Sequence, residues 1–259
     1  MKKLSVYLLV VLMGIFSWPF QSFAQSDYDR NVLKLQLTPL IFNSYGVQFE
    51  KMVNERISIA ISSSYMPSFS NFVKNQVETY YDDPQSLDDL QSLDFKRFSF
   101  TPEVRFYLGK KEGPRGFYIA PYLNYSSYQL SLDNFTVTLD SEGVPEEYQG
   151  EFSRNFNLNG AIKGVSGGVL FGTQFKLGKS AYLDWWILGA SYGGSNGDLE
   201  VISSQPLSQE WQDAVRDRVN EIDIPFVEIN TTVSANGATS TLSGPWANVR
   251  TGLSLGFKF

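Results

Sequence analysis

The chain has 259 residues, a formal net charge of −6, and neither cysteine nor histidine. Without cysteine, the fold can contain no disulfide and no thiolate-bound metal. Without histidine, it lacks the side chain that most often serves as a general base in catalysis. Aromatic residues make up 15% of the chain, and together with the many valines and isoleucines they favour strands with half-buried faces.

The N-terminus has the three parts of a secretory signal peptide. Lys2 and Lys3 precede an apolar stretch at residues 4–16, and Ser22 and Ala24 place small residues at the positions that a signal peptidase reads. We predict cleavage after Ala24, so that residues 1–24 are the signal peptide and residues 25–259 form one domain. An uncleaved anchor is the weaker alternative, because the apolar stretch is shorter than the roughly 20 residues of a spanning helix. The absence of cysteine excludes a lipoprotein, and the absence of a second long apolar run rules out a helical membrane protein.

Apolar and polar residues alternate with a period of two along much of the remaining chain, which is typical of strands with one apolar face. The last segment shows it best: Leu253, Leu255, Phe257 and Phe259 alternate with small or polar residues up to the C-terminus. Each predicted strand has at least the roughly 9–11 residues that a tilted strand needs to cross a bilayer. We predict strands at residues 31–41, 44–53, 57–67, 94–108, 116–130, 162–177, 181–193 and 245–259.

The connections between these strands alternate in length. Residues 54–56, 109–115 and 178–180 are short links, whereas residues 68–93, 131–161 and 194–244 are long; only the link near residues 42–43 breaks the rule. Short turns on one side and long loops on the other, with an even number of strands, are typical of outer-membrane barrels. The sequence therefore predicts an all-β fold: an eight-stranded antiparallel up-and-down transmembrane β-barrel with short periplasmic turns and long extracellular loops.

The three predicted long loops are strongly acidic. They hold 19 of the 27 acidic residues and only 4 basic ones, which favours a solvated surface. Weak binding of divalent cations at the pairs Asp82-Asp83 and Asp88-Asp89 is less favoured, because these pairs lack the spacing and the glycine of a calcium loop. Within the last loop, residues 206–223 carry apolar residues at helical spacing and predict a short helix. We expect it to cap the barrel mouth rather than to dock a partner.

Charged residues also occur on the polar face of the predicted strands, where they are expected to point into the barrel. Buried charges are normally paired, and eight strands leave room for side chains but not for an aqueous channel. An ion-pair network is therefore favoured over an active site built from interior carboxylates. The predicted lumen charge network consists of Lys34, Glu50, Arg97, Glu103, Arg105, Asp184 and Arg250, and Lys258 is expected to share the interior.

Several segments resemble a family of small outer-membrane barrels of unknown function that is frequent in Bacteroidota. They are "PEVRFYLG", "GFYIAPYLNYSSY", "GGVLFGTQFKLG", "LDWWILGASYGG" and the ending "VRTGLSLGFKF". The resemblance implies an eight-stranded barrel, as in the transmembrane domain of OmpA-like proteins, and no activity. Phe259 is similar to the terminal aromatic residue that the barrel-assembly machinery reads, which implies that it is an assembly signal. The resemblance does not extend to residues 194–244.

These observations favour a non-enzymatic integral outer-membrane protein of a Gram-negative bacterium that contributes to envelope structure or surface contacts. The enzymes known on small outer-membrane barrels depend on histidine, which this chain lacks. The alternatives are an adhesin or binding module that acts through the acidic loops, a membrane enzyme that uses interior carboxylates, and a soluble periplasmic barrel. We expect no cofactor, no metal, no nucleic acid and no obligate small-molecule ligand. The expected partners are outer-membrane lipid, lipopolysaccharide and the barrel-assembly machinery.

Overall fold

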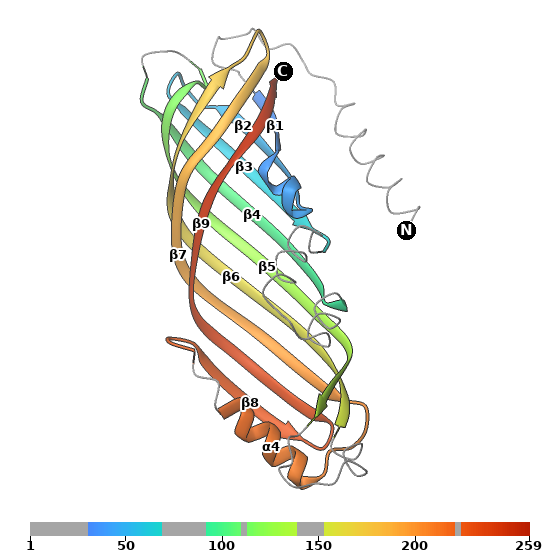
Figure 1. The fold of residues 1–259 in the computed structure, drawn as a ribbon. Coiled ribbons are helices and arrows are strands. Elements are labelled where there is room, and N and C mark those ends of the chain that lie inside the picture. The colour runs from blue at the N-terminus through green and yellow to red at the C-terminus, as the bar shows by residue number, and fades with distance from the viewer. Residues whose placement is uncertain (1–30, 69–91, 110–112, 139–152, 221–223) are drawn as a thin grey trace, which may run out of the picture.

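The computed structural model describes residues 31–68, 92–109, 113–138, 153–220 and 224–259. The signal peptide, both acidic pairs of the first long loop and the short stretches at 110–112, 139–152 and 221–223 lie outside these residues. In the described part of the chain, nine strands form one antiparallel sheet, and pairing of β1 with β9 closes it into a barrel-like ring (Figure 1). Its strands are β1 (Asn31–Gln36), β2 (Tyr45–Met52), β3 (Ile57–Met66), β4 (Asp94–Tyr107), β5 (Gly116–Thr138), β6 (Ser153–Lys176), β7 (Ala181–Ser203), β8 (Glu228–Ser234) and β9 (Gly237–Lys258).

Eight of these strands make the ring, in the order β1 to β7 and then β9, which returns to β1. All pairs are antiparallel, as the sequence predicts, and the β1–β9 closure runs from Val32 opposite Lys258 to Gln36 opposite Ser254. The eighth strand, β8, pairs only with β9 and lies outside the ring. The C-terminus lies at one end of the molecule, and β8 lies at the other end (Figure 1).

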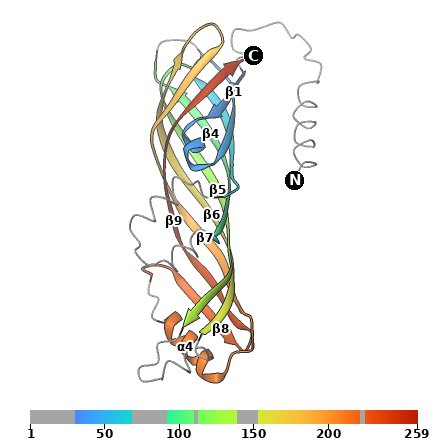
Figure 2. The same ribbon diagram turned by 45° about the vertical axis from the view of Figure 1, so that its right-hand side comes forward.

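The wall of the ring is uneven in height. It rises from 6 residues in β1 to 14 in β4 and to 22–24 in β5, β6, β7 and β9. Met66 is the last residue of β3. Strand pairing places it in one row across the sheet with Arg97, Tyr128, Ile162, Gly197 and Leu242 of the following strands. We call the parts of β5, β6, β7 and β9 beyond that register, with β8 and the helix α4 (Gln209–Asn220), the extension. Figure 2 shows it as a blade that continues one side of the ring.

The extension corrects the sequence analysis, which assigned residues 131–161 and 194–244 to loops. β5 continues to Thr138, β6 begins at Ser153, β7 continues to Ser203, and β8 and the first part of β9 follow α4. The expected helix is present, but it does not cap the barrel mouth. Trp211 and Leu207 pack on Phe156 in the extension, with Phe135 and Val201 beside them. Among the described residues, no helix is long and apolar enough to span a membrane.

The first strand also ends earlier than predicted. Instead of continuing to residue 41, β1 stops at Gln36, and the 3-10 helix η1 (Thr38–Phe42) follows. Pro39 in η1 has no backbone N–H and cannot extend the ladder. The side chain of Thr38 supplies one of the missing ladder hydrogen bonds, because its Oγ1 accepts a hydrogen bond from the backbone N of Leu253 at 2.9 Å.

Side chains sort to the two faces of the ring by alternation. In β4, Ser99, Thr101, Glu103, Arg105 and Tyr107 are buried in the lumen. The alternate residues Phe98, Phe100 and Phe106, together with Leu108 directly after the strand, are 40–63% exposed on the outer face. The molecule is therefore polar inside the ring and apolar outside it, the reverse of a water-soluble barrel.

Candidate functional site: the ring lumen

Six of the seven charged residues predicted for the lumen meet in one cluster. Lys34 comes from β1, Glu50 from β2, Glu103 and Arg105 from β4, Asp184 from β7 and Arg250 from β9. Each lies at an inward position of its strand, because alternate residues of a strand point to the same face. The ring thereby brings together residues that are up to 216 positions apart (250 − 34). We call these six residues the ion cluster.

Lys34 and Arg105 form the centre of the ion cluster. The Lys34 Nζ lies 2.6 Å from Glu50 Oε2 and 2.6 Å from Asp184 Oδ2. Arg105 Nη1 lies 2.6 Å from the same Asp184 oxygen and 3.4 Å from Glu50 Oε2. All four side chains are 0% exposed. Two cations and two carboxylates therefore hold β1, β2, β4 and β7 together across the lumen.

A second group of pairs extends the ion cluster to β9. Arg105 Nη2 lies 2.5 Å from Glu103 Oε1, and the other oxygen of Glu103 accepts from Arg250 Nη1. The Arg250 guanidinium also stacks on Trp186, with its carbon 4.0 Å from the ring centroid. Three cations face three carboxylates, so the net charge of the ion cluster is 3 − 3 = 0.

Neutral side chains satisfy most of the remaining polar atoms of the ion cluster. Tyr107 donates to Glu50 at 2.6 Å, Tyr118 donates to Asp184 at 2.7 Å, and Ser58 donates to Glu50 at 2.5 Å. Gln48 donates to Glu103, and Gln174 accepts from Lys34 at 2.6 Å. The sequence analysis missed these five residues. Their signal was present, because all five lie on predicted strands, but polar residues without charge were not singled out.

Two glycines make room for these long side chains. A Cβ at Gly172 would lie 2.3 Å from the Tyr118 hydroxyl and 2.9 Å from the Trp185 carbonyl oxygen. A Cβ at Gly256 would lie 2.9 Å from Cγ of Lys34. Both contacts are shorter than carbon atoms tolerate, so glycine allows Tyr118 and Lys34 to cross the lumen and reach Asp184.

Arg97 does not join the ion cluster, which corrects the sequence analysis. Its guanidinium carbon lies 5.7 Å from the ring centroid of Tyr128, nearer to the extension. Among the described residues, no carboxylate forms an ion pair with it. Lys258 is half-buried at the opposite end of the ring, where β9 stops.

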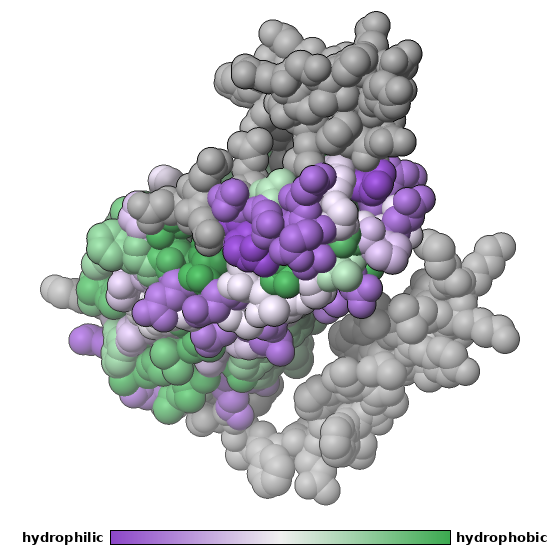
Figure 3. All heavy atoms as spheres, turned by 90° about the horizontal axis from the view of Figure 1, so that it is seen from below, coloured by the Kyte–Doolittle hydropathy of each residue, from purple (hydrophilic) through white to green (hydrophobic). Residues whose placement is uncertain are grey.

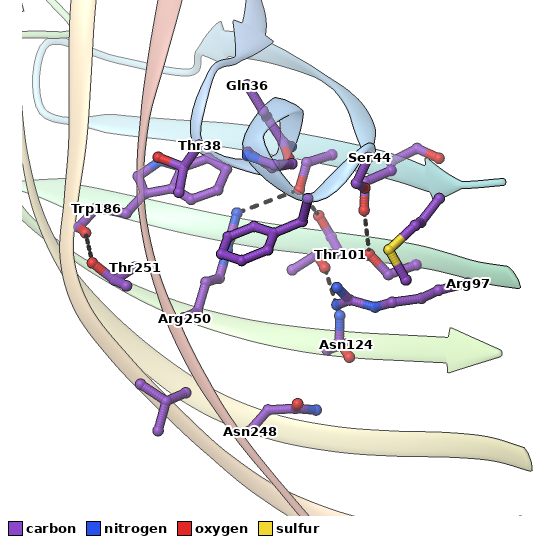
Figure 4. A pocket seen from close by; sticks show the side chains of 18 of the residues that line it. Gln36, Thr38, Ser44, Arg97, Thr101, Asn124, Trp186, Asn248, Arg250 and Thr251 are labelled. Atoms are coloured by element: carbon purple, nitrogen blue, oxygen red, sulfur yellow. Dashed lines mark hydrogen bonds between the residues drawn. The ribbon is translucent and has the colours of Figure 1, made fainter. Parts of the chain in front are cut away.

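A cavity of about 510 Å³ lies in the lumen beside the ion cluster, with Arg250 and Trp186 on its wall. Hydroxyl groups of Ser62, Ser64, Ser99 and Thr101 line it, together with the apolar side chains of Phe42 and Met66. In Figure 4, Arg97 and Arg250 extend into this space from β4 and β9. We call this space the lumen cavity.

The contacts of the ion cluster suit a structural role, in which paired charges hold strands together. Each of its carboxylates contacts at least one ammonium or guanidinium group, so that none is held as an unpaired base within the described residues. Among the same residues, no group of three or more acidic side chains is arranged to hold a metal ion. The arrangement binds five strands to one another and fills the lumen at this level.

Phe259, the predicted assembly signal, lies on the outer face at the end of β9. Its ring is 57% exposed and lies 6.5 Å from the ring centroid of Phe49. Its backbone N donates to the carbonyl oxygen of Asn31 at 3.1 Å, next to the seam between β1 and β9. Its role in assembly stays a prediction.

Comparisons with known proteins identify a family and several similar solved structures, including the two that follow. Residues 8–196 match the family described as "Protein of unknown function (DUF3575)". A major outer membrane protein from Thermus thermophilus is similar at 11% identity and a TM-score of 0.35, over 89% of this chain and 98% of that one. The translocator domain of the autotransporter NalP from Neisseria meningitidis is similar at 12% identity and a TM-score of 0.29, over 100% and 95% of the two chains. No curated protein matches the chain.

Proposed function

The chain belongs to the DUF3575 family of proteins of unknown function, and from that premise we propose that it is an integral outer-membrane β-barrel with a braced, non-conducting lumen. In this proposal the ring spans the membrane, and the extension stands outside the cell for envelope or surface contacts. The observation that carries the proposal is the reversal of polarity across the wall of the ring.

The outer face of the ring is apolar on every strand. Exposed outer residues include Leu33, Val47, Ile59, Phe100, Phe117, Phe171, Trp185 and Leu253, one from each of the eight strands. On β4 the apolar run from Phe98 to Leu108 covers ~33 Å of strand, which at a tilt of ~40° makes a band about 25 Å tall. That height suits the hydrocarbon region of an outer membrane. Seen from the end that carries α4, green apolar side chains gather on the flank of the molecule, behind a purple hydrophilic surface (Figure 3).

Tyrosines mark one edge of this apolar band. Tyr45 and Tyr65 are paired across β2 and β3, and both point outward. Tyr125 on β5 and Tyr192 on β7 are outward-facing too, and Tyr192 is 70% exposed. Tyrosine is enriched where a membrane meets water, because its ring is apolar and its hydroxyl is polar. The tyrosines support an interface on the side of the extension.

The extension has the composition of a segment in water. The outward residues of β8 and of the first part of β9 are Thr, Ser, Asn and Glu, and α4 carries exposed Asp213 and Arg216. Long connections of outer-membrane barrels face the outside and short turns face the periplasm. The extension is therefore proposed to be extracellular. Cleavage of the signal peptide, contact with lipopolysaccharide and recognition by the barrel-assembly machinery belong to the same proposal.

The ion cluster supports a structural role over an enzymatic one. A catalytic carboxylate needs access to substrate, whereas Glu50 and Asp184 are 0% exposed and each contacts Lys34 and Arg105. The hypothesis of an adhesin differs only in what the extension contacts, and it remains the second candidate because α4 and β8 form an ordered surface there.

Epitope tags on the two sides of the ring test the proposal. One tag is inserted after Ala235, in the turn between β8 and β9, and the matched tag after Lys179, in the short turn between β6 and β7. Both variants are expected in the outer-membrane fraction. An antibody should bind intact cells only when the tag follows Ala235, and it should reach the second tag only after permeabilisation. Recovery of the protein in the soluble fraction, or the reverse pattern of labelling, would reject the proposal.

A further inference from the structure

The described lining of the lumen cavity is cationic. It includes Arg97 and Arg250 but neither aspartate nor glutamate. Glu103, which is not part of this lining, pairs with Arg250, which leaves Arg97 as the cation without an acidic partner among the described residues. A cation without a protein counterion near an enclosed space favours an anionic occupant.

Several donors around the lumen cavity also lack an acceptor among the described residues. Within that part of the chain, Tyr122, which is 5% exposed, has no partner for its hydroxyl, and Asn248 has none for its side-chain Nδ2. The Nε of Arg97 has none either. Buried polar groups normally find a hydrogen-bond partner, so three such groups in one lining indicate an absent acceptor. Serine and threonine hydroxyls on β3 and β4 add further donors.

The lumen cavity also reaches the outer face of the ring. Because β1 ends at Gln36, its pairing with β9 stops at Ser254, and β8 pairs with β9 only up to Ser243. Among the described residues, no strand pairs with this edge of β9 between those two points. Val249, which is 74% exposed on the outer face, lines the lumen cavity, as do Pro39 and Phe42 of η1. As far as the described residues show, the cavity thus opens sideways through the wall, on the side of β9 that faces η1.

This side opening lies within the apolar band. Ala247 pairs with Tyr192, which lies at the proposed interface, and Val249 is two residues further into the band. Leu253, on the other side of Val249, lies deeper still. An occupant of the lumen cavity therefore meets polar donors at one end and lipid at the other. A site with polar donors at one end and an apolar opening at the other suits a ligand that has a polar headgroup and an apolar tail.

We propose that the lumen cavity binds the anionic headgroup of a lipid, with Arg97 and Tyr122 as headgroup ligands and the acyl chain passing out between η1 and β9. The shared chemistry is a carboxylate or phosphate oxyanion on an acyl chain. The inference rests on the membrane placement proposed above. It departs from the expectation, drawn from the sequence, that no small-molecule ligand is required.

The test uses the full mature barrel in lipid nanodiscs and the fluorescence of cis-parinaric acid as the probe. Wild-type protein is expected to bind the acid and to bind its uncharged methyl ester at least about tenfold more weakly, the effect of losing a hydrogen-bonded charge. Arg97→Gln should weaken binding of the acid by about tenfold as well, whereas Arg97→Lys should retain most of it. Arg56→Gln is the matched control, because Arg56 is exposed at the opposite end of the ring.

Competition identifies the headgroup and separates a lipid from a free anion. Displacement of the probe by oleate, by oleoyl lysophosphatidate or by both supports the proposal. Displacement of the probe by acetate or inorganic phosphate that is as effective as displacement by the lipids would indicate a site for free anions and would overturn the proposal. The proposal would also be overturned if the wild-type protein bound the acid and the methyl ester equally well, and the Arg97→Gln variant did the same. Failure of the barrel to insert into nanodiscs would instead reject the membrane placement, so the two proposals fail separately.

Discussion

Glu103 is the residue whose loss should damage the ring most. It is fully buried between Arg105 and Arg250, and its removal leaves two guanidinium groups without their shared carboxylate. Breaking such a buried pair costs about 3–5 kcal/mol. We predict that Glu103→Ala lowers the urea midpoint of the folded barrel in lipid or detergent far more than Glu200→Ala. Glu200 is an exposed glutamate on β7, so it controls for the loss of charge alone.

Equal midpoints for these two variants would contradict the inward assignment of Glu103. A shift of one residue in a strand exchanges every side chain between its two faces. The whole of β4 would then be out of register with the proposed lumen.

Gly172 is expected to be intolerant of any side chain. A methyl group there would meet the Tyr118 hydroxyl and the carbonyl oxygen of Trp185, and overpacking of this kind costs about 1–3 kcal/mol. We predict that Gly172→Ala lowers the urea midpoint of the folded barrel, measured by the same titration. Gly178→Ala is the control, since a Cβ at Gly178 would meet no atom within 4 Å. A Gly172→Ala variant as stable as Gly178→Ala would show that Tyr118 does not occupy the position described.

At the scale of elements, the docking of α4 depends on one aromatic side chain. Trp211 is 4% exposed and its ring centroid lies 6.2 Å from that of Phe156. Truncating a buried tryptophan costs about 3–5 kcal/mol. We predict that Trp211→Ala releases α4 and speeds proteolysis within residues 204–227, while the ring still migrates as a folded, heat-modifiable species.

Arg216→Ala is the control for this variant. Arg216 lies on the same helix but is half-exposed in a pair with Asp213, and such pairs contribute only about 0–1 kcal/mol. Similar proteolysis of both variants, or loss of the heat-modifiable species in Trp211→Ala, would contradict an independently docked helix.

The strands that the sequence predicted well are those with an apolar outer face and a polar lumen face. In β4 and in the C-terminal half of β9, the outward residues are apolar and most lumen residues are polar or small, so alternation is visible. The extension was assigned to loops because its few apolar side chains, such as Phe135, Phe156 and Val201, gather against α4 instead of repeating regularly along the strands. Strand residues such as Thr136, Asn155 and Thr239 are polar, and the side chains of Thr136 and Asn155 hydrogen-bond to each other at 2.9 Å, so these positions leave no apolar period in the sequence.

The lumen was predictable where strands are regular and unpredictable where they are not. Lys34, Glu50 and Glu103 follow simple alternation. On β7, however, the register with β9 shifts between Trp186 and Gly189, which moves the inward positions from even to odd numbers. A bulge of this kind depends on the neighbouring strand, so the inward positions of β7 beyond Trp186 required the structure. Arg97 follows the same alternation as Glu103 and Arg105 on β4, and it stays outside the ion cluster because it lies farther along the strand, at the register of Tyr128.

At the scale of the whole molecule, the ion cluster should block ion flow. Lys34, Glu50, Arg105 and Asp184 fill the lumen with side chains that are 0% exposed, and eight-stranded barrels leave little room beyond such side chains. We predict that the purified protein produces no stable ion conductance in planar lipid bilayers. Steady, ohmic openings of the wild-type protein would show that the ion cluster does not close the ring.

The central claim is that the ring presents its apolar face to lipid, and β4 offers the most direct measurement. Because the chain contains no cysteine, single cysteines at positions 98–101 and 103–106 can carry a nitroxide spin label in reconstituted membranes. Collision with oxygen, which concentrates in lipid, should be high at residues 98, 100, 104 and 106 and low at residues 99, 101, 103 and 105. Accessibility without this period of two, or with the opposite phase, would contradict a membrane-spanning ring with the ion cluster inside.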